Sequence, residues 1–387
     1  MSKPTAYIAD LIFDGTVFHQ QSALLVEGGK IVSIASRNDV PSRFVIADQT
    51  SHYIVPGFVD LQVNGGGGAL FNDNPTIEGI RIICSAHARF GTTALLPTLI
   101  TDTAETRDRA LAAGKAAFEQ RVPGYLGLHL EGPHLSIARK GCHLGDLIRP
   151  LDQDDVAALQ AAVGSFGIPM ITLAPENVLP EQIASLADGG WKVSLGHTDC
   201  KGATALDYFE AGASLVTHLF NAMSQLANRE PGLVGAALAS DPIHCGMIVD
   251  GFHVDVTTMK VALSAKKGPG KIFFVTDAMS PTGTDATQFE LFGRTIYRRD
   301  GRLTLEDGTL AGADIDMNTM VKRACQALSL SLEEALRMAS LYPAQAIGAT
   351  GKGHLKAGAD ADFLFLDQDL TLGSTWIAGS CAFETGM

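Results

Sequence analysis

The chain has 387 residues, of which 46% are hydrophobic and 18% are charged, so it can bury a large core and is not an extended disordered protein. Its 42 acidic and 29 basic residues give a formal net charge of −13, which argues against general binding to nucleic acid or to an anionic membrane surface. No run of about 18 consecutive apolar residues is present, so no membrane-spanning helix is expected.

The first 55 residues contain short segments in which apolar and polar residues alternate, separated by Asp-Gly and Gly-Gly turn signals. This pattern is typical of β-strands, which we expect within residues 5–13, 22–36 and 43–55. The same pattern returns near the end of the chain, within residues 355–367. We therefore predict a small β-sandwich domain that is formed by residues 1–55 together with residues 354–387.

The middle of the chain repeats a different unit, a short apolar run followed by a stretch with helical spacing. The apolar runs are residues 57–62, 92–98, 124–131, 169–176, 192–197, 213–219, 245–251 and 271–278. Near-continuous apolar runs are expected of parallel strands that are covered on both faces, and helices are expected within residues 76–91 and 151–166. Eight such units over about 220 residues have the size of a TIM barrel. We predict an α/β fold with a TIM-type (β/α)8 barrel over residues 56–353.

A doubly wound open sheet is the alternative architecture, and it would carry a Gly-rich phosphate loop after its first strand. The four glycines at positions 65–68 follow the first apolar run. They lack the G-x-G-x-x-G spacing and the acidic residue about 20 positions later that a dinucleotide site requires. A flexible loop is therefore the simpler interpretation.

The six cysteines are scattered singly, without a C-x-x-C pair, which argues against a zinc knuckle or a disulfide framework. Near the amino terminus, Asp10 and Asp14 interrupt the apolar stretch that a secretory signal would need. We expect a protein of the reducing cytoplasm.

Polar residues follow most of the predicted strands, where the reactive groups of a TIM barrel lie. They are Gln62 and Asn64, His129 and Glu131, His197, His218, Asp250 and His253, and Asp277. A single histidine at such a place is usually structural, but recurrence at successive strand ends favours a shared site. Glu131, His197 and His218 form a ligand set that zinc and similar ions favour in catalytic sites. Asp277 is then a spare carboxylate, suited to act as a general base beside a metal-bound water.

Longer motifs resemble a known family. PGFVD (56–60) and TDA (276–278) are similar to the amidohydrolase superfamily, and HLEGPH (129–134), THLFNAM (217–223) and DGFH (250–253) resemble N-acetylglucosamine-6-phosphate deacetylases. The resemblance extends from the amino-terminal strands to GADADF (358–363). It implies metal-dependent hydrolysis of N-acetylglucosamine 6-phosphate to glucosamine 6-phosphate and acetate, in amino-sugar catabolism and cell-wall sugar recycling.

The resemblance also implies roles for particular positions. It assigns the metal to Glu131, His197 and His218, and the catalytic steps to Asp277 and His143. It assigns substrate contacts to Cys142, His143, Asn221, Ala222, Arg229, His253, Leu310, Ala311 and Gly312. Within that set, Arg229 and His253 match groups around the sugar phosphate, and such an arginine can come from the partner subunit of a dimer. Residues 310–312 match a segment that closes over the acetyl end.

The sequence departs from the superfamily at the end of the first barrel strand. Many members carry His-x-His there, whereas this chain has Gln62-Val63-Asn64. Neutral amides are poorer zinc ligands than imidazole. We therefore predict one divalent metal ion per subunit, with Zn²⁺ expected and Fe²⁺, Co²⁺ or Mn²⁺ as alternatives. The resemblance further implies a homodimer or a dimer of dimers.

Two other functions stay open at this point. A different amidohydrolase, acting on cyclic amides or N-acyl amino acids, would keep the metal ligands but would not need Arg229 or His253. A non-catalytic relative would usually have lost one or more of the ligands, and all of them are present here. The role of His129 also stays open, because it shares a strand face with Glu131 and could support a ligand or be a remnant one.

Overall fold

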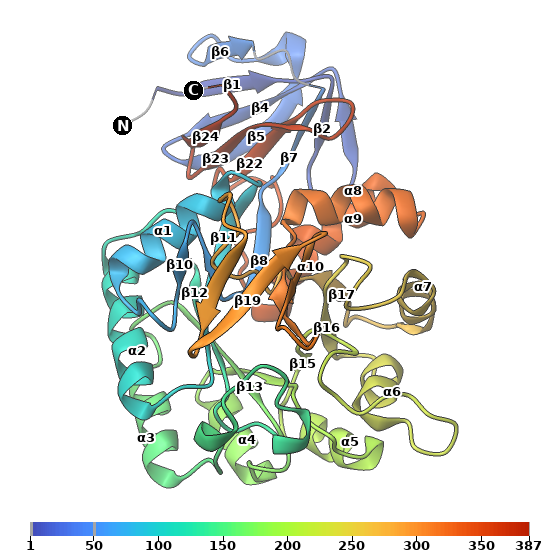
Figure 1. Cartoon of the computed structure of the whole chain (residues 1–387). Helices are drawn as coiled ribbons and strands as arrows, with labels where there is room; N and C mark the ends of the chain where they lie inside the picture. The colour runs from blue at the N-terminus through green and yellow to red at the C-terminus, as the bar shows by residue number, and fades with distance from the viewer. Residues whose placement is uncertain (1–2, 49–51, 387) are drawn as a thin grey trace.

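The computed structural model describes residues 3–48 and 52–386. Figure 1 shows two parts, a barrel ringed by helices and, above it, a pair of sheets in which both ends of the chain lie. The predicted α/β class with a TIM-type barrel is confirmed.

The barrel strands coincide with the eight predicted apolar runs. They are β8 (Phe58–Val63), β11 (Thr92–Ile100), β12 (Gly127–Glu131), β13 (Ile168–Leu173), β14 (Lys192–Leu195), β15 (Leu215–Val216), β16 (His244–Met247) and β17 (Ile272–Phe274), and they lie in this order in one parallel sheet. The sheet closes beyond β17, where the Asp277 N–H donates to the Gln62 carbonyl at 3.0 Å and Val63 pairs with Ala278. Because all strands run the same way, their carboxyl ends meet at one end of the barrel.

Helices alternate with these strands and cover the outer face of the barrel (Figure 1). They are α1 (Ile77–Ala88), α2 (Ala104–Glu119), α3 (Gln153–Ala162), α4 (Pro180–Asp188), α5 (Gly202–Glu210), α6 (Gly232–Ala239) and α7 (Val256–Ala265). Side-chain caps start several of them: Thr76 accepts a hydrogen bond from the Gly79 N–H at α1, and Asp152 forms a capping box with Asp155 at α3. In the described part of the chain, no helix combines the length and the apolar character that crossing a bilayer requires.

Three further helices lie in the chain between β21 (Leu310–Ala313) and β22 (Phe363–Leu366). They are α8 (Met317–Ala327), α9 (Leu332–Ala339) and α10 (Leu341–Ile347). Both α9 and α10 contact β8 and β17, so they cover the place where the barrel closes.

Two sheets pack face to face beside the barrel, one made of amino-terminal strands alone and the other of strands from both ends of the chain. One has the order β5–β4–β1–β6, and the other has the order β24–β23–β22–β7–β2–β3. The strands are β1 (Thr5–Ile8), β2 (Leu11–Phe13), β3 (Phe18–Gln20), β4 (Ser22–Glu27), β5 (Lys30–Ser36), β6 (Val45–Asp48), β7 (Tyr53–Pro56), β22 (Phe363–Leu366), β23 (Leu372–Ile377) and β24 (Ser380–Glu384). One apolar cluster joins the two sheets, with Leu24 from the first and Ile54 and Phe363 from the second.

Most of these strands lie in the predicted segments at both ends of the chain, whereas β3, β23 and β24 lie outside those segments. Residues 49–51, in the segment expected at 43–55, lie outside the described residues. Since β7 ends at Pro56 and β8 begins at Phe58, the chain passes between the two parts near Gly57. The domain boundaries at residues 55 and 354 remain predictions.

A four-stranded antiparallel sheet follows the last barrel strand and was not expected. It consists of β18 (Gln288–Leu291), β19 (Arg294–Arg299), β20 (Arg302–Thr304) and β21 (Leu310–Ala313), and β19 crosses in front of the barrel strands in Figure 1. Its first two turns are Phe292-Gly293 and Asp300-Gly301, in which every residue has a positive φ, as tight hairpins require. The pairing of Ala313 with Ala278 attaches this sheet to the end of the eighth barrel strand.

Candidate active site

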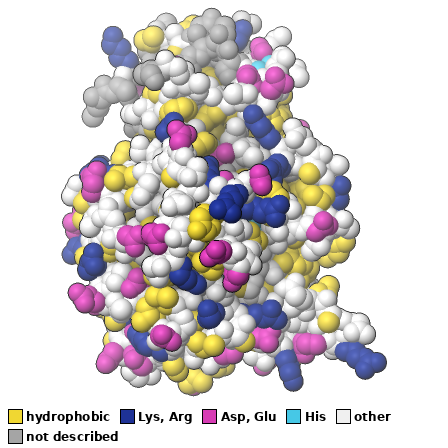
Figure 2. Space-filling view, in the orientation of Figure 1, with side chains coloured by type: hydrophobic (Ala, Val, Ile, Leu, Met, Phe, Trp, Pro, Cys, Tyr) yellow, Lys and Arg dark blue, Asp and Glu magenta, His cyan; other side chains and the backbone are white. Residues whose placement is uncertain are grey.

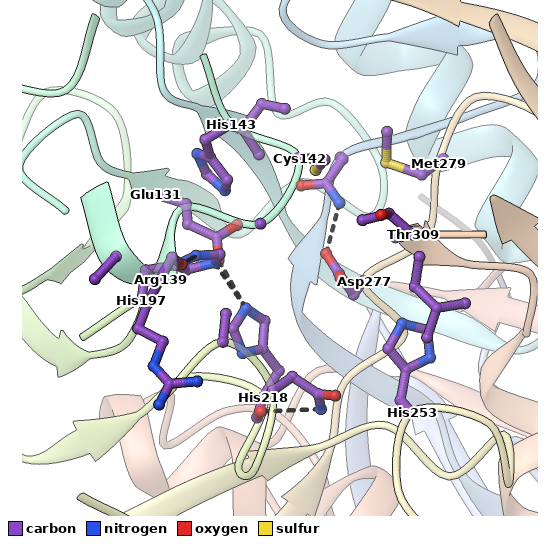
Figure 3. Close-up of a pocket in the computed structure, with 18 residues that line it drawn as sticks. Glu131, Arg139, Cys142, His143, His197, His218, His253, Asp277, Met279 and Thr309 are labelled. Carbon is purple, nitrogen blue, oxygen red and sulfur yellow. Dashed lines mark hydrogen bonds and ion pairs between the residues drawn. The ribbon is translucent and has the colours of Figure 1, made fainter. Parts of the chain in front are cut away.

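A cavity of about 360 Å³ lies at the carboxyl end of the barrel. It gathers all but two of the predicted site residues, and Figure 3 shows several of them converging from different strands. The predicted residues in its lining are Glu131, Cys142, His143, His197, His218, Asn221, Ala222, His253, Asp277, Leu310 and Gly312.

Glu131, His197 and His218 meet inside this cavity. The Glu131 Oε1 atom lies 3.1 Å from the His197 Nε2 and 3.0 Å from the His218 Nε2, and the two nitrogens are 3.1 Å apart. Tetrahedral zinc ligands about 2.1 Å from the ion would lie only slightly further apart, at roughly 3.4 Å. All three side chains are buried. The geometry therefore suits one divalent cation.

The backbone is strained at two of these ligands and at Asp277. His197, His218 and Asp277 adopt positive φ angles of 49°, 27° and 50°, which cost on the order of 1–3 kcal/mol each for residues other than glycine. The His197 Nδ1 lies 2.9 Å from the Arg139 carbonyl oxygen, which can only accept a hydrogen bond. His197 therefore carries its proton on Nδ1 and presents the Nε2 lone pair to a metal.

A second ligand set is also available in this cavity. One atom each from Glu131, His143 and His197 lie within 4.8 Å of one another. The set that contains His218 is tighter, with all three separations between 3.0 and 3.1 Å. Distance alone therefore favours His218 as the third ligand.

Gln62 and Asn64 hold the two carboxylates of the site. The Asn64 Nδ2 donates to the Asp277 Oδ1 at 2.6 Å, and the Gln62 Nε2 lies 3.2 Å from the same oxygen and 3.1 Å from both oxygens of Glu131. Because ionised carboxylates only accept hydrogen bonds, both amides turn N–H groups toward the interior of the site. Donor groups facing inward do not bind a cation.

The surroundings of Glu131 and Asp277 shift the pKa values of the two carboxyl groups in opposite directions. Burial, and next the negative charge of Glu131, raise the pKa of Asp277 above its ordinary value. Burial acts in the same direction on Glu131, but its close contacts with the His197 and His218 rings outweigh burial and hold the pKa of Glu131 well below its usual range. Glu131 is therefore an ionised ligand, while Asp277 is the better proton acceptor.

The run of glycines at 65–68 supports the strand end that carries Asp277. It forms a hairpin of β9 (Gly65–Gly66) and β10 (Ala69–Leu70), and Gly65, Gly67 and Gly68 donate backbone hydrogen bonds to the segment 278–282 at 2.8–3.0 Å. A Cβ atom on Gly65 would lie 2.7 Å from the Ser280 nitrogen. The interpretation of this run as a flexible loop is wrong, since close backbone approach requires glycine here.

The segment that carries Asp277 is also held by a residue that was not predicted to be functional. Asp60 is fully buried on β8 and accepts a hydrogen bond from the Thr276 hydroxyl at 2.5 Å and from the Thr276 N–H at 3.2 Å. Burial raises the pKa of Asp60 to about 7. Asp60 is the last residue of the PGFVD motif, and this motif could have indicated its importance from the sequence.

Two predicted residues do not line the cavity within one chain. Ala311 is fully buried in an apolar cluster with Met279 and Leu291, because alternation along β21 places Leu310 and Gly312 on the cavity side and Ala311 on the other. Arg229 is exposed on the loop that precedes α6. The substrate roles of both residues remain predictions.

His253, Cys142 and His129 lie in or near the cavity and differ in their surroundings. The His253 Nδ1 lies 2.5 Å from the Asp250 Oδ2, so this carboxylate orients the ring. Burial raises the pKa of the Cys142 thiol to about 12, so Cys142 is no thiolate nucleophile. His129 lies 2.7 Å from the Thr172 hydroxyl and 3.3 Å from the Thr98 hydroxyl, which occupies both ring nitrogens and favours a supporting role.

Known proteins share this fold and these motifs. The Amidohydrolase family model matches residues 53–385. An N-acetylgalactosamine-6-phosphate deacetylase from Shewanella sp. (strain ANA-3) is 44% identical over 335 residues, which is 87% of this chain and 84% of that protein. An N-acetylglucosamine-6-phosphate deacetylase from Haemophilus influenzae is 34% identical over 331 residues, which is 84% of this chain and 85% of that protein.

A solved structure gives the same result. The N-acetylglucosamine-6-phosphate deacetylase from Pasteurella multocida superimposes with a TM-score of 0.93 at 36% sequence identity, over 98% of this chain and 99% of that one. The match of the family model to most of the chain and the identity to these relatives lead to one conclusion. This chain belongs to the amidohydrolase family, among its N-acetylhexosamine-6-phosphate deacetylases.

Proposed function

We propose that this chain is a metal-dependent hydrolase that removes the acetyl group from N-acetylglucosamine 6-phosphate, giving glucosamine 6-phosphate and acetate. The observation that carries the proposal is the buried cluster of one carboxylate and two imidazoles, with separations of 3.0–3.1 Å, beside an aspartate that the cluster does not need. Relatives with 34–44% identity that are named for this type of reaction support it.

A divalent cation held by Glu131, His197 and His218 would activate a water molecule and polarise the acetyl carbonyl. Asp277 takes the proton of the attacking water, while Asn64 and Gln62 hold its Oδ1 atom in place. His143 donates a hydrogen bond to the oxygen on which negative charge develops. Asp277 then delivers its proton to the sugar nitrogen, so that the leaving group departs as a neutral amine.

We propose a single cation per subunit, with zinc expected and iron, cobalt or manganese as alternatives. The N–H groups that Gln62 and Asn64 turn toward the carboxylates support this number, because they take the place of a second set of imidazole ligands. The His/Glu donor set suits several divalent ions, so the affinity order and metal supply decide which one is bound.

We also propose that Arg229 completes the phosphate site across a homodimer interface in the cytoplasm. The basic residue that lines the cavity, Arg139, is paired with Asp199 at 2.7–2.8 Å. Arg229 lies on an exposed loop with Leu226, which is 57% exposed, and Figure 2 shows this loop projecting at the lower right. A mixed dimer of an Arg229→Ala chain and an Asp277→Asn chain should regain activity, since one of its two sites would be intact. A mixture as inactive as its parents would contradict action across the interface.

Replacing Asp277 with Asn tests the proposed reaction itself. Loss of the general base should lower kcat for N-acetylglucosamine 6-phosphate by about 10²- to 10⁴-fold with little change in KM. Asp188→Asn, at the exposed last residue of α4, is the matched control and should behave like the wild type. An Asp277→Asn enzyme with unchanged turnover would exclude the assignment.

N-acetylgalactosamine 6-phosphate is a second candidate substrate. The observation that favours it is the higher identity, 44% against 34%, to the relative named for that sugar. Comparing kcat/KM for the two epimers decides between them. An N-acyl amino acid in the same assay tests the other amidohydrolase activities.

A further inference from the structure

Thr101 lies directly behind His143, at the end of barrel strand β11. None of the predicted site residues comes from this strand. Thr101 is 1% exposed, and its Oγ1 atom is 2.7 Å from the His143 Nδ1. The backbone N–H of Thr101 points at the same ring nitrogen, with an N···N distance of 3.4 Å. Two groups of one residue therefore meet a single atom of the histidine.

The backbone contact determines where the proton of His143 resides. An amide N–H can only donate, so the Nδ1 must present its lone pair. The Thr101 hydroxyl can donate or accept, and it then donates to the same lone pair at 2.7 Å. A hydrogen on Nδ1 would satisfy the hydroxyl but would face the hydrogen of the amide. Only the tautomer with its proton on Nε2 satisfies both contacts.

The local backbone is shaped to hold this hydroxyl. Gly132, which follows Glu131, has a φ of +88°, and a Cβ atom there would lie 2.4 Å from the Thr101 Oγ1. The hydroxyl thus occupies the space that the missing side chain leaves. On the other side, the guanidinium of Arg294 on β19 donates to the carbonyl of Cys142, the residue before His143. The loop that carries His143 is therefore held from β11 and from the sheet above it.

His143 itself faces the cavity with little freedom. It is 3% exposed, and its ring centroid is 4.5 Å from that of His197 (Figure 3). Because its Nδ1 accepts from the Thr101 N–H, that nitrogen has no hydrogen. The single proton of the ring is therefore on Nε2.

We propose that Thr101 is a positioning residue that keeps the proton of His143 on Nε2, so that the ring acts as a hydrogen-bond donor in the cavity and not as a metal ligand. This resolves the choice between the two ligand sets, because a protonated Nε2 has no lone pair for a cation. The kinetic consequence rests on the proposed deacetylase function, whereas the tautomer and the ligand set do not.

The kinetic test compares three variants in the metal-loaded enzyme. Thr101→Val removes the hydroxyl at nearly constant volume, and Thr101→Ser keeps it. Thr92→Val is the matched control, because Thr92 lies on the same strand, is also 1% exposed, and has a hydroxyl without a hydrogen-bond partner in the described structure. We expect Thr101→Val to lower kcat by about 10- to 100-fold with little change in KM. Thr101→Ser should retain most of the activity, and Thr92→Val should match the wild type.

The spectroscopic test does not need a substrate. In protein labelled with ¹⁵N-histidine, the His143 signals are assigned by their loss in His143→Gln. We expect a pyrrole-type Nε2 and a pyridine-type Nδ1 in the wild type. In Thr101→Val only the longer contact of the backbone N–H, at 3.4 Å, remains at Nδ1, so we expect an increased share of the Nδ1-protonated tautomer. Metal content should stay at the wild-type level in Thr101→Val and in His143→Gln.

Each outcome bears on the proposal separately from the proposed function. A wild-type protein with its proton on Nδ1, or a His143→Gln protein that has lost its ion, would overturn it. Equal losses in Thr101→Val and Thr92→Val, or no rescue by serine, would do the same. If the wild type hydrolyses no sugar phosphate but shows the expected tautomer, the proposed function fails and the role of Thr101 in setting the tautomer stands.

Discussion

Replacing Asn64 with Asp exchanges the amide that donates to Asp277 for a third carboxylate in the active site. The Asn64 Nδ2 lies 2.6 Å from the Asp277 Oδ1, and Asn64 is only 2% exposed, so the new oxygen has nowhere to move. Two carboxylates at this distance cannot both ionise freely, and the pair should share a proton. Asp277 then becomes a base only at higher pH.

The size of the effect follows from the separation of the charges. At about 4 Å between charge centres and an effective dielectric constant of about 20, the repulsion is about 4 kcal/mol, which corresponds to a rise of about 3 units in the pKa of the pair. Asn64→Leu removes the donor without adding charge. Losing a hydrogen bond to a charged group costs about 1.5–3 kcal/mol, which predicts a rise of about 1–2 units.

The assay is the pH dependence of kcat/KM for the wild type and both variants. The acid limb should move to higher pH in the order wild type, Asn64→Leu, Asn64→Asp, and activity below each limb should fall about tenfold per pH unit. Asn38→Asp, which adds the same charge at an exposed position in the small domain, should leave the profile unchanged. An acid limb of Asn64→Asp that coincides with the wild type would refute the reasoning, as would a fully active variant that binds two ions.

Three further results are expected. Chelation should abolish activity, and adding back the metal should restore it with one ion per chain by elemental analysis; two tightly held ions would contradict a single-metal site. Burial lowers the pKa of His87 from 6.5 to about 4, so the unfolded chain binds more protons between these values and stability falls as the pH drops through them, by up to about 3 kcal/mol. His87→Gln should reduce this fall in denaturant unfolding at pH 7 and pH 4.5, and an unchanged slope would argue against it. Lys352→Met should cost about 3–5 kcal/mol, because it leaves the carboxylate of Asp362, 2.6 Å away and buried, without its partner. The double variant Lys352→Met/Asp362→Asn should recover part of that loss if the isolated charge is the cause.

The barrel could be predicted because its strands are buried on both faces. A strand such as Thr92–Ile100 is buried along its whole length and is therefore mostly apolar, and this leaves a pattern that a single sequence displays. The sheet over the barrel mouth had a signal as well, in Phe292-Gly293 and Asp300-Gly301, but its strands are short and half-exposed, so their pattern is weak.

The site was predictable where its members belong to motifs or end strands. Glu131, His197, His218 and Asp277 follow apolar runs, and parallel strands bring such positions together. Ala311 shows the limit of a motif, which matches a segment but does not say which side chains of a strand face the cavity. Arg229 shows another limit, since a motif does not say whether a matched side chain lines the cavity of its own chain.

The sequence by itself determined the parallel barrel, the order of its strands and the carboxylate and imidazoles at their ends, because periodicity and residue type are properties of the chain. Only the tertiary structure decided how the protons and the space in the site are distributed. It placed the amides of Gln62 and Asn64 against two carboxylates, and it set Thr101 behind His143. These relations depend on distances of about 3 Å between residues that are dozens to hundreds of positions apart, and no local pattern records them.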